Sequence, residues 1–226
     1  MPGKMIEFPS NGAQCHGYLA TPQSGSGLAV IVIQEWWGLV DHIKNVADRF
    51  AKEGFVALAP DLYHGKSTKS PDEAGKLFMA LNISQAERDL RGAIQHVLSL
   101  KETRGSVAGV VGFCMGGQLS LYAGCANRSV GACVDYYGIH PNVQPHIKSL
   151  HAPVLGFFAE NDKFVTPDVV VKLEKELRDA GKQVEFHIFR GADHAFFNDT
   201  RKEVYHESYA RQSWQRMIEF FTQHLA

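Results

Sequence analysis

The chain has 226 residues, of which 45% are hydrophobic and 21% charged, values typical of a folded globular protein with a large core. Its formal net charge of −1, with no basic block, argues against nucleic acid and an anionic membrane surface as partners. No apolar run approaches the ~20 residues of a membrane span. The length predicts a single domain covering residues 1–226.

Short apolar runs bounded by turn residues predict the strands of a mostly parallel sheet. The runs are rich in Val, Ile and Phe and mostly do not alternate with polar residues, as expected for strands buried on both faces. The predicted strands are Leu28–Gln34, Phe55–Ala59, Val107–Phe113, Ala132–Tyr137, Val154–Ala159 and Val184–Phe189. The Pro/Ser/Gly-rich stretch Thr21–Gly27 is interpreted as a turn between two early strands.

Amphipathic helices are predicted between these strands. Ser84 and Glu87 form a predicted capping box at the start of one of them. The apolar faces consist of Ile43, Val46, Ala47 and Phe50, then Leu90, Ala93, Ile94, Val97 and Leu98, and finally Trp214, Met217, Ile218, Phe221 and Leu225. This strand–helix alternation predicts an α/β fold with right-handed crossovers and helices on both faces of the sheet. Reactive groups are then expected at the carboxyl ends of the strands.

A turn at Cys114 predicts a nucleophile. The segment Gly112-Phe113-Cys114-Met115-Gly116 follows a strand and opens a helix, in the G-x-nucleophile-x-G form with Cys in place of Ser. The glycines give clearance for a sharp turn, and the helix N-terminus favours a thiolate. The Met115 N–H is expected to point toward a developing oxyanion. The alternative is a buried cysteine whose neighbouring glycines serve only packing.

The other three cysteines lack such surroundings and are interpreted as structural: Cys15, Cys125 and Cys133. The four cysteines form no CxxC pair, which argues against a zinc site and a disulfide scaffold. A reducing, cytoplasmic setting is therefore expected, and the start of the chain shows no signal-peptide pattern. We expect no metal ion and no cofactor.

The candidate acid and base of a triad follow the nucleophile in the chain, because this fold places nucleophile, acid and His in that order. Asp162 follows the strand Val154–Ala159 in a turn before a Pro-started helix, and Glu160 is the competing carboxylate. His194 follows Val184–Phe189 and is predicted to be the general base. Asp193 and the mid-strand His187 are expected to play no catalytic part. The alternative to these catalytic roles is that Asp162 only stabilises its turn and that His194 is an ordinary surface residue.

Taken together, these motifs resemble the dienelactone hydrolase (carboxymethylenebutenolidase) family of the α/β-hydrolases. The resemblance runs from about residue 5 to the end of the chain. The residues that carry it are Gln34-Glu35-Trp36-Trp37-Gly38, Ala59-Pro60-Asp61-Leu62-Tyr63, Gly112-Phe113-Cys114-Met115-Gly116-Gly117, Asp135-Tyr136-Tyr137-Gly138, Asp162 and Gly191-Ala192-Asp193-His194-Ala195-Phe196. It implies a hydrolase with a Cys–His–Asp triad. It further implies that Glu35 helps to form the thiolate and that the Trp36 N–H joins the oxyanion hole.

The same resemblance shows departures that concern the substrate. The family member that acts on dienelactone binds a substrate carboxylate with two Arg residues. Asn198 stands where one is expected, Ala195 replaces a Ser, and residues 70–80 contain Gly75 and Phe78 but no Arg. The two-Arg clamp is therefore predicted to be absent, and Arg190 or Arg201 is the available substitute.

The resulting hypothesis is hydrolysis of a small-molecule ester or lactone through a thioester on Cys114. The expected substrate pocket is lined by Trp36, Phe78, Tyr136 and Phe196. Asn198, which stands where the resemblance leads one to expect an Arg, is also expected to contact the substrate. Acyl transfer, thioester hydrolysis and a non-catalytic redox or binding role for Cys114 remain alternatives. The expected assembly is a monomer or a small homo-oligomer.

Overall fold

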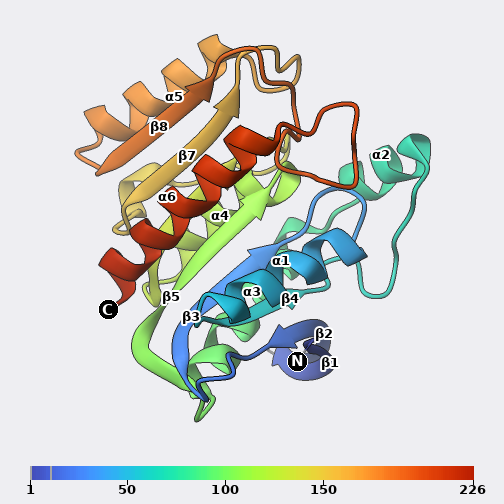
Figure 1. Ribbon diagram of the computed structural model, residues 1–226, viewed down its shortest axis with the longest axis vertical. Coiled ribbons are helices and arrows are strands. Elements are labelled where there is room, and N and C mark those ends of the chain that lie inside the picture. Colours follow the sequence, from blue (N-terminus) through green and yellow to red (C-terminus); the bar gives the residue numbers. More distant parts are fainter. Residues whose placement is uncertain (1, 11) are drawn as a thin grey trace.

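The computed structural model describes residues 2–10 and 12–226, which form a sheet flanked by helices (Figure 1). The sheet has the strand order β1-β2-β4-β3-β5-β6-β7-β8. Its strands are β1 (Lys4–Ser10), β2 (Ala13–Ala20), β3 (Gly27–Ile33), β4 (Val56–Pro60), β5 (Thr103–Phe113), β6 (Val130–Tyr136), β7 (Val154–Ala159) and β8 (Val184–Phe189). From β4 to β8 neighbouring strands are parallel, whereas β1 and β2 pair antiparallel and β2 joins β4 antiparallel.

The six predicted strands are confirmed, with shifts at their ends. β5 starts four residues earlier than expected, at Thr103, because a register shift between Leu28 and Ala29 lets its exposed first residues pair with β3. The inner strands β3, β4 and β7 are buried along almost their whole length, while the edge strand β8 is half-exposed. Burial on both faces explains why the inner strands show no alternation of polar and apolar residues.

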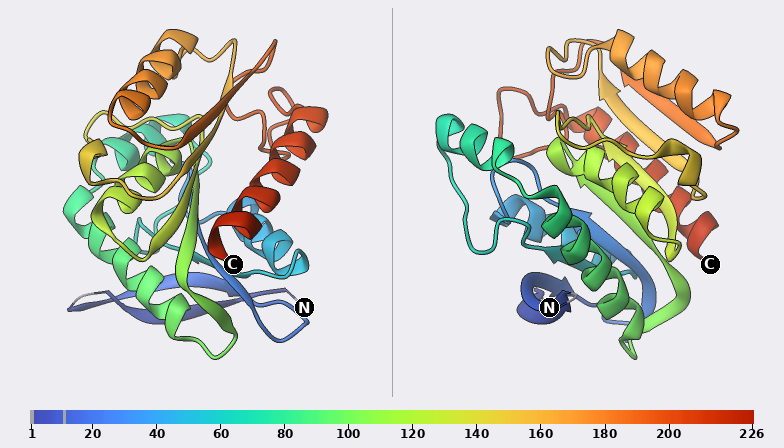
Figure 2. Two further views of the ribbon diagram at one scale, coloured as in Figure 1. Left: turned by 90° about the vertical axis from the view of Figure 1, so that its left-hand side faces the viewer. Right: turned by 180° about the vertical axis from the view of Figure 1, so that it is seen from behind.

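Helices cover both faces of the sheet (Figure 2). On one face lie α1 (Asp41–Lys52) and α6 (Glu207–Leu225), and on the other α3 (Ile83–Ser99), α4 (Met115–Ala126) and α5 (Pro167–Asp179). The short helix α2 (Pro71–Met79) and the 3-10 turn η1 (Ile147–Ser149) complete the described elements. No helix within the described residues is both long and apolar enough to cross a membrane.

One predicted helix start is wrong. The side chain that caps α3 is Asn82, whose Oδ1 accepts a hydrogen bond of 3.0 Å from the Gln85 N–H, whereas Ser84 already lies inside the helix. Asn and Ser cap helices about equally well. Asn82, whose backbone is extended, therefore serves as the N-cap in place of Ser84. The start of α5 at Pro167 agrees with the prediction.

The topology places four loops at one edge of the sheet. The loops after β3, β5, β7 and β8 all leave the carboxyl ends of parallel strands. These loops carry Glu35, Cys114, Asp162 and His194, one residue each. This is the edge at which parallel α/β sheets bind their ligands.

Candidate active site

Cys114 occupies a strained turn between β5 and α4. Its backbone has φ 54° and ψ −119°, a conformation that a non-glycine residue rarely adopts. The turn is held by the Cys114 N–H, which donates to the Tyr136 carbonyl at 3.0 Å, and by the Cys114 carbonyl, which accepts from Gly117 at 2.9 Å. Such strain persists only where the surrounding structure enforces it, and it is often found at functional residues.

The glycines around this turn are required by space. A Cβ atom at Gly112 would lie 1.8 Å from the Gly116 carbonyl oxygen. A Cβ atom at Gly116 would lie 2.6 Å from the carbonyl oxygens of Ile33 and Gln34. The second contact shows that α4 begins directly against the end of β3, so the loop carrying Glu35 and the turn carrying Cys114 are neighbours.

The two backbone N–H groups predicted to form the oxyanion hole have no partner in the described part of the chain. The N–H of Met115 belongs to the first residue of α4, and the N–H of Trp36 belongs to the loop after β3. Free N–H groups at a helix N-terminus are suited to an anion.

Asp162 is fixed by the loop after β7. Its Oδ1 accepts hydrogen bonds from the N–H groups of Phe164 at 2.8 Å and Val165 at 2.9 Å. Its Oδ2 lies 2.6 Å from Nδ1 of His194, and the carboxylate is fully buried. Asp162 thus stabilises its turn and also orients the imidazole.

Both Asp162 and Cys114 act on the pKa of His194. Burial lowers the pKa of His194, but hydrogen bonding to Asp162 and to Cys114, together with the electrostatic effect of the same two groups, outweighs burial and raises the pKa to about 10. The side chain is 15% exposed, so solvent screens these interactions only weakly. The raised pKa favours the imidazolium form of His194 at neutral pH.

The competing groups lie elsewhere. The Glu160 carboxylate accepts a 2.7 Å hydrogen bond from the Gly191 N–H and so ties the β7 and β8 loops together. The side chain of Asp193 is exposed, and His187 contacts Glu185 at 2.6 Å on β8. Of the three candidate carboxylates, Asp162, Glu160 and Asp193, only Asp162 contacts the ring of His194 in the described residues.

Glu35 is buried and paired with an amide. It is 1% exposed, and its Oε2 accepts a 2.7 Å hydrogen bond from Nδ2 of Asn198. Asn198 is itself held by Thr200, whose N–H and hydroxyl both donate to Oδ1. The sequence singled out both residues but missed their pairing. The amide satisfies one carboxylate oxygen of Glu35 without supplying a positive charge.

The expected pocket residues are only partly placed at the site. Trp36 is half-buried and packs edge-on against Trp37, with ring centroids 4.9 Å apart. Phe78 of α2 is half-buried and packs against the ring of His140, with ring centroids 4.4 Å apart. Phe196 is fully buried in the core.

The expectation that Tyr136 lines the pocket is not met. Its ring is fully buried between Phe113 and Phe157, at 4.8 Å from each, and its hydroxyl lies near Ser213 of α6. The next residue, Tyr137, packs its ring at 4.9 Å from His194 instead. A positive φ of 43° at Tyr137 separates the directions of the two side chains.

Asp135 lies directly beneath the start of α4. A Cβ atom at Gly117 would lie 2.2 Å from Asp135 Oδ1, so the carboxyl group packs against the helix backbone. Burial, opposed by the Gly138 N–H, raises the pKa of Asp135 from 3.8 to about 7. Between these two values the folded chain retains a proton that the unfolded chain has released. The contribution of Asp135 to stability therefore falls as pH rises from about 4 to 7 and stays lowest above 7.

Replacing Asp135 with Asn is expected to raise the melting temperature more at about pH 8 than at about pH 5, because the neutral amide removes a buried charge only where that charge exists. Thermal unfolding at both pH values measures the difference. Asp72→Asn, at an exposed position of α2, is the matched control and should show no such pH dependence. An equal effect of Asp135→Asn at both pH values would contradict the assignment of a raised pKa.

The comparisons with known proteins agree with this architecture. The model of the dienelactone hydrolase family matches residues 15–225. The chain belongs to the dienelactone hydrolase family. It is 37% identical to Protein usf of Aquifex pyrophilus, over 99% of each chain, and 36% identical to a protein of Aquifex aeolicus provisionally named carboxymethylenebutenolidase, again over 99% of each.

A solved structure from Klebsiella pneumoniae, provisionally named a dienelactone hydrolase, is 30% identical and superimposes with a TM-score of 0.88, covering 98% of both chains. The predicted α/β-hydrolase fold is confirmed, and membership of the dienelactone hydrolase family makes the chain a hydrolase.

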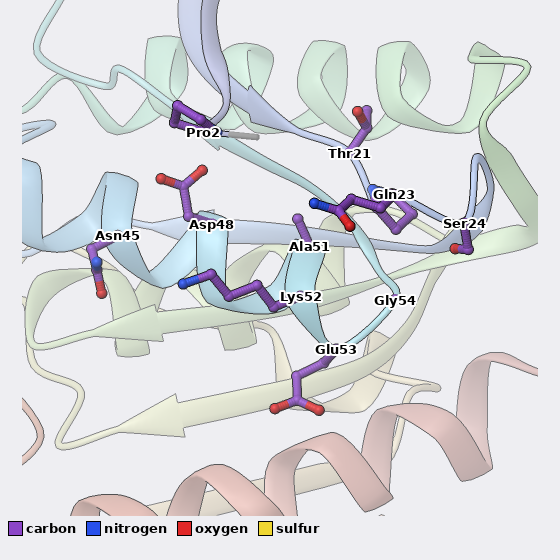
Figure 3. Close-up of a pocket in the computed structure, with 11 residues that line it drawn as sticks. Pro2, Thr21, Gln23, Ser24, Asn45, Asp48, Ala51, Lys52, Glu53 and Gly54 are labelled. Carbon is purple, nitrogen blue, oxygen red and sulfur yellow. The ribbon is translucent and has the colours of Figure 1, made fainter.

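Two cavities flank this dienelactone hydrolase fold. One of about 680 Å³ lies beside the candidate site, lined in part by Trp37, Asn198 and Arg201. Arg201, one of the two candidate substitutes for the missing clamp, thus lies next to the amide that holds Glu35. The other cavity, of about 650 Å³, lies at the amino edge of the parallel strands, between α1 and the turn that contains Gln23 (Figure 3). Neither cavity is lined by any of the four residues carried by the carboxyl-edge loops.

Proposed function

We propose that the protein cleaves small-molecule esters or lactones with Cys114 as nucleophile, His194 as acid and base, and Asp162 as the group that orients His194. The observation that carries the proposal is the 2.6 Å contact between Nδ1 of His194 and Oδ2 of Asp162, with Cys114 close enough to contribute to the raised pKa of His194. This is the arrangement that nucleophilic acyl transfer requires.

The environments of the other thiols support the choice of Cys114. Burial raises the pKa of Cys15 to about 12, with a further contribution from the charges of Asp89 and Asp61. Burial likewise raises the pKa of Cys125 to about 11, and burial raises the pKa of Cys133 further still. These three side chains remain protonated thiols at neutral pH and are poor nucleophiles. The proposed thiol chemistry fits a reducing, cytoplasmic setting, in which Cys114 stays unoxidised.

In the first half-reaction, the Cys114 proton passes to His194, directly or by way of Glu35, and the thiolate attacks the substrate carbonyl carbon. The carbonyl oxygen becomes an oxyanion that accepts hydrogen bonds from the N–H groups of Trp36 and Met115. The intermediate collapses with cleavage of the C–O bond, and the imidazolium of His194 donates its proton to the leaving oxygen. The products are an alcohol, which stays tethered in a lactone, and a thioester on Cys114.

In the second half-reaction, water hydrolyses the thioester. Acylation removes the negative charge of Cys114, which is one cause of the raised pKa of His194, so the ring can act as a neutral base. His194 takes a proton from water, the hydroxide adds to the thioester carbonyl, and the C–S bond breaks. The acid product leaves and the thiolate–imidazolium pair is restored.

The proposal is tested by incubating the purified protein with aryl esters, lactones and thioesters while identifying the products. Hydrolysis to the free acid, with the alcohol released first, is expected for an ester or lactone hydrolase. A product transferred to an added alcohol or amine in preference to water would identify an acyltransferase instead. Alkylation of Cys114 without turnover of any compound would indicate a redox or binding protein.

A further inference from the structure

Two adjacent tyrosines at the end of β6 have different surroundings. Both side chains are fully buried. The Tyr136 hydroxyl lies on the core side, near Ser213 and Arg49. Neither tyrosine hydroxyl has a hydrogen-bond partner within residues 2–10 and 12–226. A buried hydroxyl without a partner is costly, so its retention calls for a physical reason.

The backbone of Tyr137 is also strained. Its φ of 43° lies in the left-handed region, which is a genuine outlier for a bulky side chain. The Tyr137 N–H donates to the Phe157 carbonyl at 2.9 Å, which fixes this conformation at the end of the sheet. As a result, the ring packs against His194, with centroids 4.9 Å apart. The strain thus serves to direct the phenol into the catalytic loops.

Two acidic groups of the site lie close enough to Tyr137 to affect its pKa. Burial raises its pKa well above the ordinary value, and the negative charges of Glu35 and Cys114 raise it further, with a smaller opposing effect of Arg201. The hydroxyl therefore keeps its proton at any working pH. It is a neutral donor in the neighbourhood of Glu35 and Cys114.

We propose that Tyr137 is a positioning residue whose hydroxyl is kept free to donate a hydrogen bond to the negative charge that develops at Cys114 and Glu35 when the thiolate forms. The inference rests on the proposed role of Cys114 as nucleophile. No bond is made or broken at Tyr137. Its O–H turns toward the charged centre once the thiol proton has moved to His194 or Glu35, and so it favours the thiolate over the thiol.

The test is the rate at which iodoacetamide alkylates Cys114 between about pH 5 and 10, followed by mass spectrometry of the peptide that contains Cys114. In Tyr137→Phe the midpoint of the rate profile is expected to move up by about one pH unit, a roughly tenfold slower reaction below the midpoint. Tyr136→Phe is the matched control, because it removes one buried hydroxyl from the neighbouring residue, and its profile should coincide with that of the wild type.

Coincidence of the Tyr137→Phe and wild-type profiles, or an equal shift in both variants, would overturn the inference. Thermal unfolding checks that each variant is folded. If Tyr137→Phe does not fold, 3,5-difluorotyrosine at position 137 gives a second test, because its more acidic hydroxyl should move the midpoint to lower pH, and an unchanged midpoint would equally overturn the proposal. The alkylation needs no substrate, so its outcome is separate from any failure to detect ester hydrolysis.

Discussion

Replacement of Cys114 with Ala is expected to lower the turnover of p-nitrophenyl acetate by at least about 10⁴-fold. The methyl side chain cannot form a thioester, so only direct attack by water, aided by the oxyanion donors, remains. The small side chain also fits the strained turn without new contacts, so the fold should persist. Initial rates at saturating substrate, with thermal unfolding as a check of folding, measure the effect.

Cys125→Ala is the matched control for this experiment. Cys125 lies near the end of α4, the helix that Cys114 opens, and it is half-buried, but burial raises its pKa to about 11. Its removal should leave turnover within about twofold of the wild type, since no proposed step uses it. A Cys114→Ala variant that retains more than about a tenth of wild-type activity would show that another group attacks the carbonyl.

Asp162→Asn is expected to lower kcat by about 10³ to 10⁴-fold, with a smaller change in KM. The Asn oxygen can still accept from the Phe164 and Val165 N–H groups, so the loop should keep its shape. Its NH₂ group, however, would face Nδ1 of His194 and force the ring proton onto the wrong nitrogen. Loss of the carboxylate also removes one cause of the raised pKa of His194.

The sign of this pKa effect gives a second readout. In the wild type the raised pKa means that imidazolium stabilises the fold below about pH 6.5, and this contribution is lost as pH rises through about 10. In Asp162→Asn the imidazole should titrate at a lower pH, which NMR of the ring protons can follow. Glu160→Gln changes a carboxylate in the same loop that does not touch His194 and should stay near wild-type activity. An Asp162→Asn variant within tenfold of wild type would contradict the orienting role.

The sequence alone predicts the parallel sheet because its inner strands are uninterrupted apolar runs, which need no information from distant residues. The candidate nucleophile, acid and base were predictable for a similar reason. Each lies in a short strand-end loop, and the carboxyl ends of parallel strands meet at one edge. Cys114 is the clearest case, since the glycines that its turn requires are its immediate neighbours in the chain.

Other features depend on contacts that a local pattern does not contain. The Glu35–Asn198 hydrogen bond joins residues 163 positions apart, and no spacing rule predicts it. The choice of Tyr137 over Tyr136 beside His194 depends on one positive φ, which reverses the expected alternation of side chains at the end of β6. The helix cap at Asn82 was missed because Ser84 also fits a capping pattern.

The most direct test of the proposed chemistry is to trap the acyl-enzyme. Wild-type protein is mixed with p-nitrophenyl acetate, quenched in acid within the burst of p-nitrophenolate, and digested for mass spectrometry. The proposed mechanism predicts one acetyl group per chain on Cys114, linked as a thioester that hydroxylamine removes. A protein that turns over the ester while Cys114 stays unmodified, or that carries the acetyl group on another residue in the productive burst, would contradict it.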